Sequence, residues 1–237
     1  MFPDTWAKSK ERLIALWHNE IVDRCCLAVT APRDGEYPPN EPFPENPKEQ
    51  EAYWLDAEQV LKRHLHRFEH TCYLGEAFPQ VILNLGPAGH AGYFRGCKVS
   101  YSQRTIWFHP FIRDWQQDPV VFDPQSLLYR KTMELARYFV EQSGGRYFVS
   151  MPDIAGNLDA LAHMRGVENL LMDLELNKEQ VRRGLDLIQE TWRSVNEAVY
   201  NIVKDNNEGG STIGWLGSWA PGYHAQMNCD LSVVISP

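Results

Sequence analysis

The chain has 237 residues, of which 43% are hydrophobic and 23% charged, and its formal net charge is −8 at pH 7. These proportions are ordinary for a globular protein and allow a substantial buried core. The acidic balance excludes a general nucleic-acid binder, because neutralising phosphates requires a basic face. No apolar run reaches the length of about 18 residues that a membrane-spanning helix needs, so we expect no membrane partner.

The N-terminal segment has charges spread through it and lacks the apolar centre of a signal peptide. We predict an amphipathic helix that Asp4 opens, since aspartate is a common first-turn cap. One face of it carries the apolar positions Trp6, Leu13, Leu16 and Trp17. Adjacent Cys25 and Cys26 point to opposite faces of a strand and are poor disulfide partners. We therefore expect reduced cysteines and a cytoplasmic protein.

Strand-like and helix-like patterns alternate after this segment. Apolar runs predict strands at 23–32, 78–84 and 147–151, and a strand with a loop at 209–222. Helical patterns are expected at 56–75, 124–142 and 177–205, with a proline-rich irregular loop at 37–50 and an antiparallel excursion at 97–108. Asp56 is the expected N-cap of the first of these helices, and Gly144-Gly145 is a natural stop for the second. Strands separated by such helices are typical of parallel βα units in a barrel or a doubly wound sheet.

Polar and aromatic residues follow several of the predicted strands. In parallel βα folds the carboxyl ends of the strands open on one face, where the loops carry the chemistry. The residues expected to converge there are Asn84, Asp153, Asn157, Trp215 and Trp219. Two alternatives stay open: Asp153 and Asn157 cap the following helix, and the tryptophans pack in the core or at its rim.

Asp159 and His163 are spaced i, i+4 on a predicted helix, which places both side chains on one face. The carboxylate is then able to orient the imidazole as a proton-handling pair. The alternative is an exposed surface pair without functional consequence. We predict no metal site: His66 and His70 lie on a solvated face, and His224 with Cys229 supplies only two ligands. The run GPAGHAG at 86–92 lacks the spacing of a phosphate loop.

Four passages carry a resemblance to a known family: 78–96, TIWFHP at 105–110, 147–181 and HAQMNCDLSVVISP at 224–237. The most specific piece is GNLDALAHMRGVENLLMDL, from Gly156 to Leu174. Together they resemble the uroporphyrinogen decarboxylase superfamily, in the branch related to corrinoid and coenzyme M methyltransferases. The resemblance implies one α/β domain over 1–237, a TIM-barrel-type (β/α)8 fold. On this resemblance we expect the last barrel strands to be missing after Pro237. A second copy in a homodimer, or residues absent here, would then cover the open edge.

The chain also departs from that family. Asn84 stands where the decarboxylases have their catalytic aspartate, and an amide cannot pair with a developing cation. Arg33 alone matches their early arginine motif, and His163 replaces a tyrosine. We therefore do not expect decarboxylation of uroporphyrinogen.

The methyltransferase relatives bind zinc through a His-x-Cys pair and a later cysteine, and this pair is absent from the chain. Zinc and a corrinoid are implied by the resemblance alone. The expected function is methyl transfer to a small-molecule substrate, with a corrinoid protein as partner. The catalytic candidates are Asp153, Asp159 and His163, and the binding candidates are Asn84, Asn157, Trp215, Trp219 and Arg33. The alternatives are a non-catalytic binding relative and a decarboxylase of another acid.

Overall fold

The computed structural model describes residues 5–37, 39 and 41–235. The chain forms two compact units, each built from three segments. Unit 1 comprises Met1–Leu83, Glu134–Met151 and Val199–His224; unit 2 comprises Asn84–Met133, Pro152–Ala198 and Ala225–Pro237. The helices α4 (Leu127–Ser143) and α7 (Lys178–Val203) each begin in unit 2 and end in unit 1, and both were predicted.

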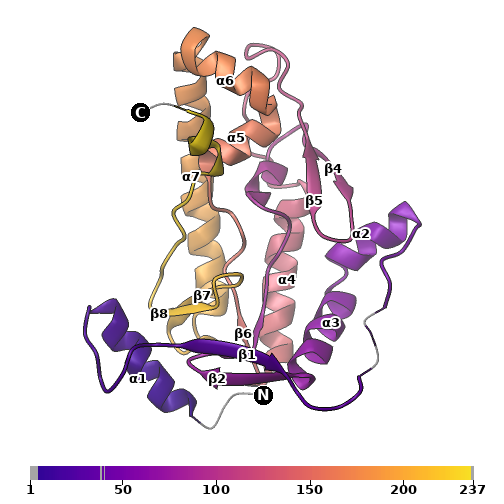
Figure 1. Cartoon of the computed structure of the whole chain (residues 1–237). Helices are drawn as coiled ribbons and strands as arrows, with labels where there is room; N and C mark the ends of the chain where they lie inside the picture. Colours follow the sequence, from indigo (N-terminus) through magenta and orange to yellow (C-terminus); the bar gives the residue numbers. More distant parts are fainter. Residues whose placement is uncertain (1–4, 38, 40, 236–237) are drawn as a thin grey trace. The chain divides into compact units, whose positions relative to one another are not determined.

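Unit 1 contains three strand pairings. β1 (Ala28–Pro32) pairs antiparallel with β2 (Thr71–Gly75), and the two strands lie side by side in Figure 1. β3 (Gln80–Val81) pairs in parallel with β6 (Phe148–Val149). β7 (Gly210–Ile213) pairs antiparallel with β8 (Ser218–Pro221), and a parallel bridge joins Met151 to Ile213.

The predicted eight-stranded parallel barrel is wrong. In the described part of the chain the strands form two-stranded sheets, and β3 with β6 is the parallel one. The apolar run 78–84 forms only two paired residues. Residues 71–75, expected to end a helix, form a strand, because their backbone groups pair with β1. A local sequence pattern does not reveal such distant pairing.

Caps determine where the helices around β2 begin. α3 (Ala57–Glu69) starts where the Asp56 side chain accepts a hydrogen bond from the Gln59 N–H at 2.9 Å, as predicted. α2 (Pro47–Leu55) begins inside the segment expected to be irregular. Asn46 caps it through the Lys48 N–H at 2.9 Å, and proline at the first helical position costs no hydrogen bond.

α1 (Trp6–Trp17) packs an aromatic cluster into the core of unit 1. The Trp6 ring lies 5.4 Å from that of Phe78, 5.1 Å from Phe148 and 5.8 Å from Trp219, all edge to face. Of the four apolar positions expected to share a face, Trp6 and Leu13 are buried, whereas Leu16 and Trp17 are exposed. The expected cap Asp4 lies outside the described residues.

A buried carboxylate ties α1 to the strands of unit 1. Glu76 is 1% exposed and accepts hydrogen bonds from Arg12 at 3.1 Å and from both terminal nitrogens of Arg24 at 2.8 Å. The Leu27 N–H donates to it at 2.7 Å. One acidic group thus satisfies donors from three residues, one in α1 and two in the loop that precedes β1.

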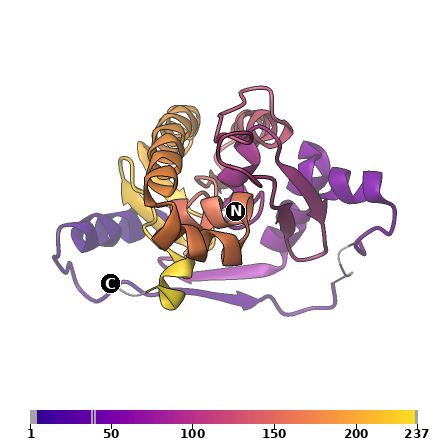
Figure 2. The ribbon, with the colours of Figure 1, turned by 90° about the horizontal axis from the view of Figure 1, so that it is seen from above.

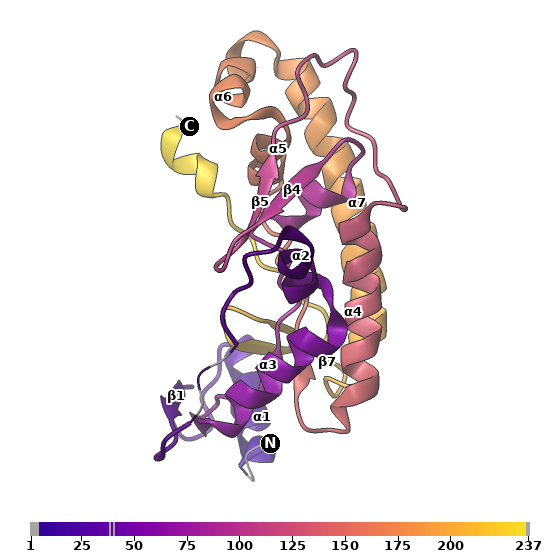
Figure 3. The same ribbon diagram turned by 90° about the vertical axis from the view of Figure 1, so that its right-hand side faces the viewer.

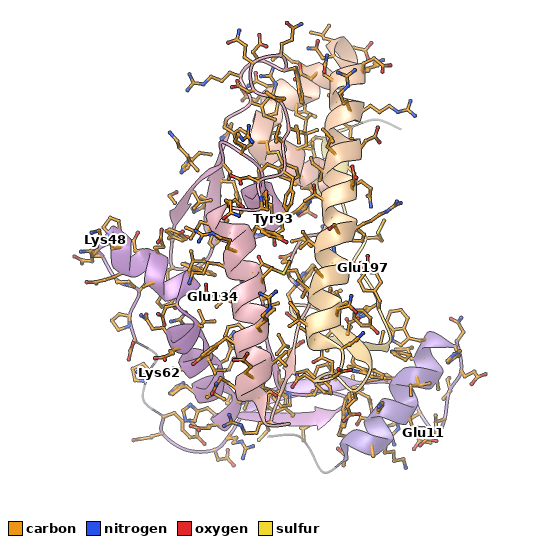
Figure 4. The ribbon with its side chains drawn as sticks, turned by 180° about the vertical axis from the view of Figure 1, so that it is seen from behind. Glu11, Lys48, Lys62, Tyr93, Glu134 and Glu197 are labelled. Carbon is orange, nitrogen blue, oxygen red and sulfur yellow. The ribbon has the colours of Figure 1, made fainter. Side chains whose placement is uncertain are left out.

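Unit 2 contains the predicted antiparallel hairpin, β4 (Lys98–Tyr101) with β5 (Ile106–His109), seen side by side in Figure 3. Its helical elements are η1 (Gly89–Tyr93), α5 (Asn157–Arg165), α6 (Val167–Leu176) and η2 (Asp230–Val234). The Tyr93 side chain is labelled in Figure 4, and its hydroxyl lies at hydrogen-bond distance, 2.8 Å, from the hydroxyl of Thr132 in α4.

The motif at 156–174 contains a buried ion pair. Arg165 donates to Asp173 at 2.7 Å, and Trp115 donates to the same carboxylate oxygen at 2.9 Å. The Arg165–Asp173 ion pair joins α5 to α6 and therefore has a structural role. Across the described residues, no helix combines the length and apolarity that crossing a bilayer requires.

Candidate functional site

The two units divide the predicted site residues between them. Unit 2 contains Asn84, Asp153, Asn157, Asp159 and His163, whereas unit 1 contains Arg33, Trp215 and Trp219. The expectation that all of them share one mouth stays a prediction.

Asp153 follows β6 directly after Pro152, and its side chain is half-buried. Its backbone carbonyl accepts a hydrogen bond from the Gly89 N–H at 3.0 Å, which holds the loop against η1. The carboxylate itself has no hydrogen-bond partner among the described residues. Burial, and then the negative charge of Asp230, raises the pKa of Asp153 to about 6. A carboxyl group with such a pKa, free of structural duties, is suited to proton transfer.

His90 lies in η1 and is completely buried. Its Nε2 lies 3.1 Å from Oδ1 of Asn157, and Nδ2 of Asn157 donates to Gln189 at 2.8 Å. This chain of bonds places the proton on Nε2 and leaves Nδ1 as an acceptor. Nδ1 has no partner in the described structure. Burial lowers the pKa of His90 to about 3, so the ring is neutral.

His163 also lies near His90, since a positive charge on His163 would lower the pKa of His90. Its Nε2 donates to the Pro87 carbonyl at 3.2 Å, and its ring lies against Phe108 with centroids 5.0 Å apart. Burial lowers the pKa of His163, and this effect exceeds the opposing effects of the carbonyl and of Asp159. His163 is therefore a neutral, oriented imidazole.

Asp159 has a structural partner that the sequence did not indicate. Its two carboxylate oxygens accept hydrogen bonds from the backbone N–H groups of Asp230 at 2.9 Å and Leu231 at 2.8 Å. It therefore caps η2, which lies beside α5 (yellow, Figure 2). The hydrogen bonds of Asp159 and of His163 go to other partners, so the imidazole is oriented by the Pro87 carbonyl and not, as predicted, by Asp159. Asp159 acts on His163 only through its charge, which opposes the lowering of the His163 pKa.

The capping alternative for Asp153 and Asn157 fails. The N-cap of α5 is Gly156, and no side chain caps this end. Gly156 has φ +77°, and a Cβ there would collide with the Asp159 carboxylate. Asn157 instead orients His90. Asn84 is exposed and uses its Oδ1 to accept from the Gly86 N–H at 3.0 Å, which stabilises the turn after β3.

The three candidates in unit 1 have different surroundings. Trp219 is 1% exposed and donates from its indole N–H to the Asn207 carbonyl at 3.1 Å, so it is a core residue. Trp215 is 57% exposed and lines a cavity of about 340 Å³. Arg33 donates to the Thr71 carbonyl at 3.1 Å and lines a second cavity of about 200 Å³.

The described residues do not fit a zinc site, since no three His, Cys, Asp or Glu side chains among them gather as metal ligands. His90, Gln189 and Asp230 were missed in the sequence. His90 carried one usable signal, a histidine within the glycine-rich run after a strand. Gln189 and Asp230 are far from the site in sequence and carried none.

Searches against protein-family models, curated proteins and solved structures each gave no match. The functional assignment therefore depends on the residues of unit 2 and on the sequence resemblance.

Replacing Asp159 with alanine is expected to destabilise the protein by about 1–3 kcal/mol, because two backbone N–H groups lose their acceptor. Urea unfolding of the variant measures this loss. The matched control is Asp186→Ala, which removes an exposed carboxylate from α7. Equal stability of the two variants would contradict the capping role of Asp159.

Proposed function

We propose that the chain is an enzyme that transfers a proton during a reaction of a small-molecule substrate, with Asp153 as the general base. The observation that carries this proposal is the half-buried carboxylate of Asp153, which has no hydrogen-bond partner in the described structure and a pKa raised to about 6. A structural aspartate normally accepts hydrogen bonds, and burial without them costs free energy. Function is one reason for a protein to retain such a group.

Asp153 is suited to act as a base at neutral pH. With a pKa near 6 the carboxylate is mostly charged there, yet it retains more affinity for a proton than an exposed aspartate. His90 and His163 belong to the same unit, and burial lowers the pKa of each, so both imidazoles are neutral at pH 7. Their role in the proposal is to present fixed polar atoms to the substrate.

The reaction class that the sequence resemblance supports is methyl transfer, as in the uroporphyrinogen decarboxylase superfamily. Asp153 would take the proton from an S–H, O–H or N–H acceptor as that atom forms its new bond to the methyl carbon. The bond between the donor and that carbon breaks in the same step, and its electron pair stays with the donor. A corrinoid protein is the proposed methyl donor. We further propose a homodimer in the cytoplasm, and the five free cysteines support a reducing compartment.

Decarboxylation of another acid is the second candidate, because the same carboxyl group in its protonated form supplies the proton that replaces carbon dioxide. The two candidates differ in pH dependence. A base gains activity as pH rises through about 6, whereas an acid loses activity over the same range.

The test measures methyl transfer from methylcobalamin to a panel of small thiols, followed by the change in cobalamin absorbance. We expect the rate to rise with pH and to level off above about pH 6. Asp153→Asn should lower it by about 100-fold or more, the usual contribution of a general base. The matched control is Asp186→Asn on the exposed face of α7.

A rate that falls through the same pH range would support decarboxylation instead. Full activity of Asp153→Asn would contradict both candidates, because neither works without this carboxyl group.

A further inference from the structure

Unit 1 contains a cavity of about 340 Å³ that the proposed chemistry does not use. Thr71 and Tyr73 of β2 line one side, and Gln80 of β3 lines another. The turn between β7 and β8, with Trp215, completes the wall. This volume lies in the range of small-molecule sites.

The cavity carries one positive charge without a counter-charge. Arg67 lines it and donates hydrogen bonds to the Gln80 carbonyl at 3.2 Å and to Nδ1 of His64 at 2.9 Å. Neither partner is acidic, and no described residue that lines the cavity is acidic either. Burial lowers the pKa of Arg67 and raises that of Tyr73. An arginine remains charged under this influence and tyrosine remains neutral, so the cavity favours an anion.

Gln80 supplies a second, independent indication of a ligand. It is 8% exposed, and its Nε2 donates to the Gly214 carbonyl at 2.8 Å. This bond determines which way the amide is oriented, and Oε1 is left buried without a partner in the described structure. A buried carbonyl oxygen without a partner costs free energy, and an N–H or O–H group of a ligand would supply the missing donor.

The cavity is also lined by aromatic side chains. Trp215 is largely exposed although it lines the cavity, and Phe78 and Tyr73 contribute further ring surface. Indole and phenyl rings bind planar apolar groups through stacked or edge-to-face contacts. An exposed tryptophan beside an unpaired arginine is a combination that a small aromatic acid satisfies.

We propose that this cavity binds a small aromatic carboxylic acid that carries a hydroxyl or amino donor. Arg67 pairs with the carboxylate, Oε1 of Gln80 accepts from the donor, and Trp215 contacts the ring. The site lies wholly in unit 1, and the proposal does not depend on the chemistry assigned to Asp153.

The test uses calorimetric titration of the full chain with three matched probes. Phenyllactate has the carboxylate, the hydroxyl and the ring, phenylpropanoate lacks the hydroxyl, and phenylpropanediol lacks the carboxylate. We expect phenyllactate to bind tightest, phenylpropanoate to bind about five-fold more weakly, and the diol to bind about ten-fold more weakly or worse. Equal affinity for phenyllactate and the diol, or no binding of any probe, would overturn the proposal.

Three variants locate the binding. Arg67→Gln should weaken phenyllactate about ten-fold while leaving the diol unchanged, because only the acid uses the charge. Trp215→Ala should weaken all three probes, and its exposed side chain makes loss of folding unexpected. Arg182→Gln is the matched control, since Arg182 is an exposed arginine of α7 that does not line this cavity. Unchanged affinity in both Arg67→Gln and Trp215→Ala would contradict this location.

Discussion

Asp153→Asn is expected to stabilise the protein at neutral pH while abolishing the proposed activity. The native environment raises the pKa of Asp153 from 3.8 to about 6, so the charged form is disfavoured in the folded state. One pKa unit corresponds to about 1.36 kcal/mol, which makes the penalty about 3 kcal/mol at most. Asparagine has nearly the same shape and carries no charge, so it removes this penalty.

The gain in stability of Asp153→Asn depends on pH, because the folded-state pKa of Asp153 is raised. An acid whose folded pKa is raised contributes stability below its unfolded pKa, and that contribution is lost as pH rises through the folded pKa. The advantage of Asp153→Asn should therefore grow from about pH 4 to about pH 6 and then remain constant. Urea unfolding of both proteins across this range measures it.

Asp159→Asn provides the contrast, because it weakens the acceptors of two backbone N–H groups and should destabilise at neutral pH. A destabilised Asp153→Asn variant would show that the carboxylate has structural partners. Greater stability together with lost activity is the pattern expected of a functional group retained at a cost to folding.

Glu76→Gln is expected to have the largest destabilising effect in unit 1. Although burial alone would raise the pKa of Glu76, hydrogen bonds from Arg24, the Leu27 N–H and Arg12 hold it below its ordinary value. Removing the negative charge leaves the Arg24 guanidinium without its ion-pair partner Glu76, whereas Arg12 keeps its pair with Asp23 at 2.7 Å. Breaking a buried ion pair by changing one partner costs about 3 kcal/mol or more.

Thermal unfolding measures this loss, which should lower Tm by about 6–12 °C for a chain of this length. A carboxylate with a lowered folded pKa contributes stability above its unfolded pKa of about 4.5, and that contribution is lost on acidification. The difference between the wild type and Glu76→Gln should therefore shrink as the pH falls below this value. The matched control is Glu175→Gln, whose pair with Lys178 is exposed. A Glu76→Gln variant as stable as this control would contradict the role of Glu76.

The sequence by itself determined the features that depend on neighbouring residues. The helices α4 and α7, the Asp56 cap of α3 and the hairpin of β4 with β5 were all predicted. Helix periodicity, side-chain capping and hairpin pairing act over a few residues, so the local pattern contains the information. Asp153 was selected for the same reason, because it follows an apolar strand and a proline.

Only the tertiary structure decided which segments meet. Residues 71–75 became a strand because β1 supplied hydrogen-bond partners from a distant segment, and this pairing contributed to the failure of the barrel prediction. Trp215 and Trp219 lie four residues apart in the same predicted loop. In the structure Trp219 is buried in the core, whereas Trp215 is exposed and lines a cavity. The i, i+4 spacing predicts that Asp159 pairs with His163, whereas in the structure its carboxylate accepts hydrogen bonds from two backbone N–H groups of η2. Burial and long-range hydrogen bonds depend on residues far apart in the chain, and a local pattern contains no record of them.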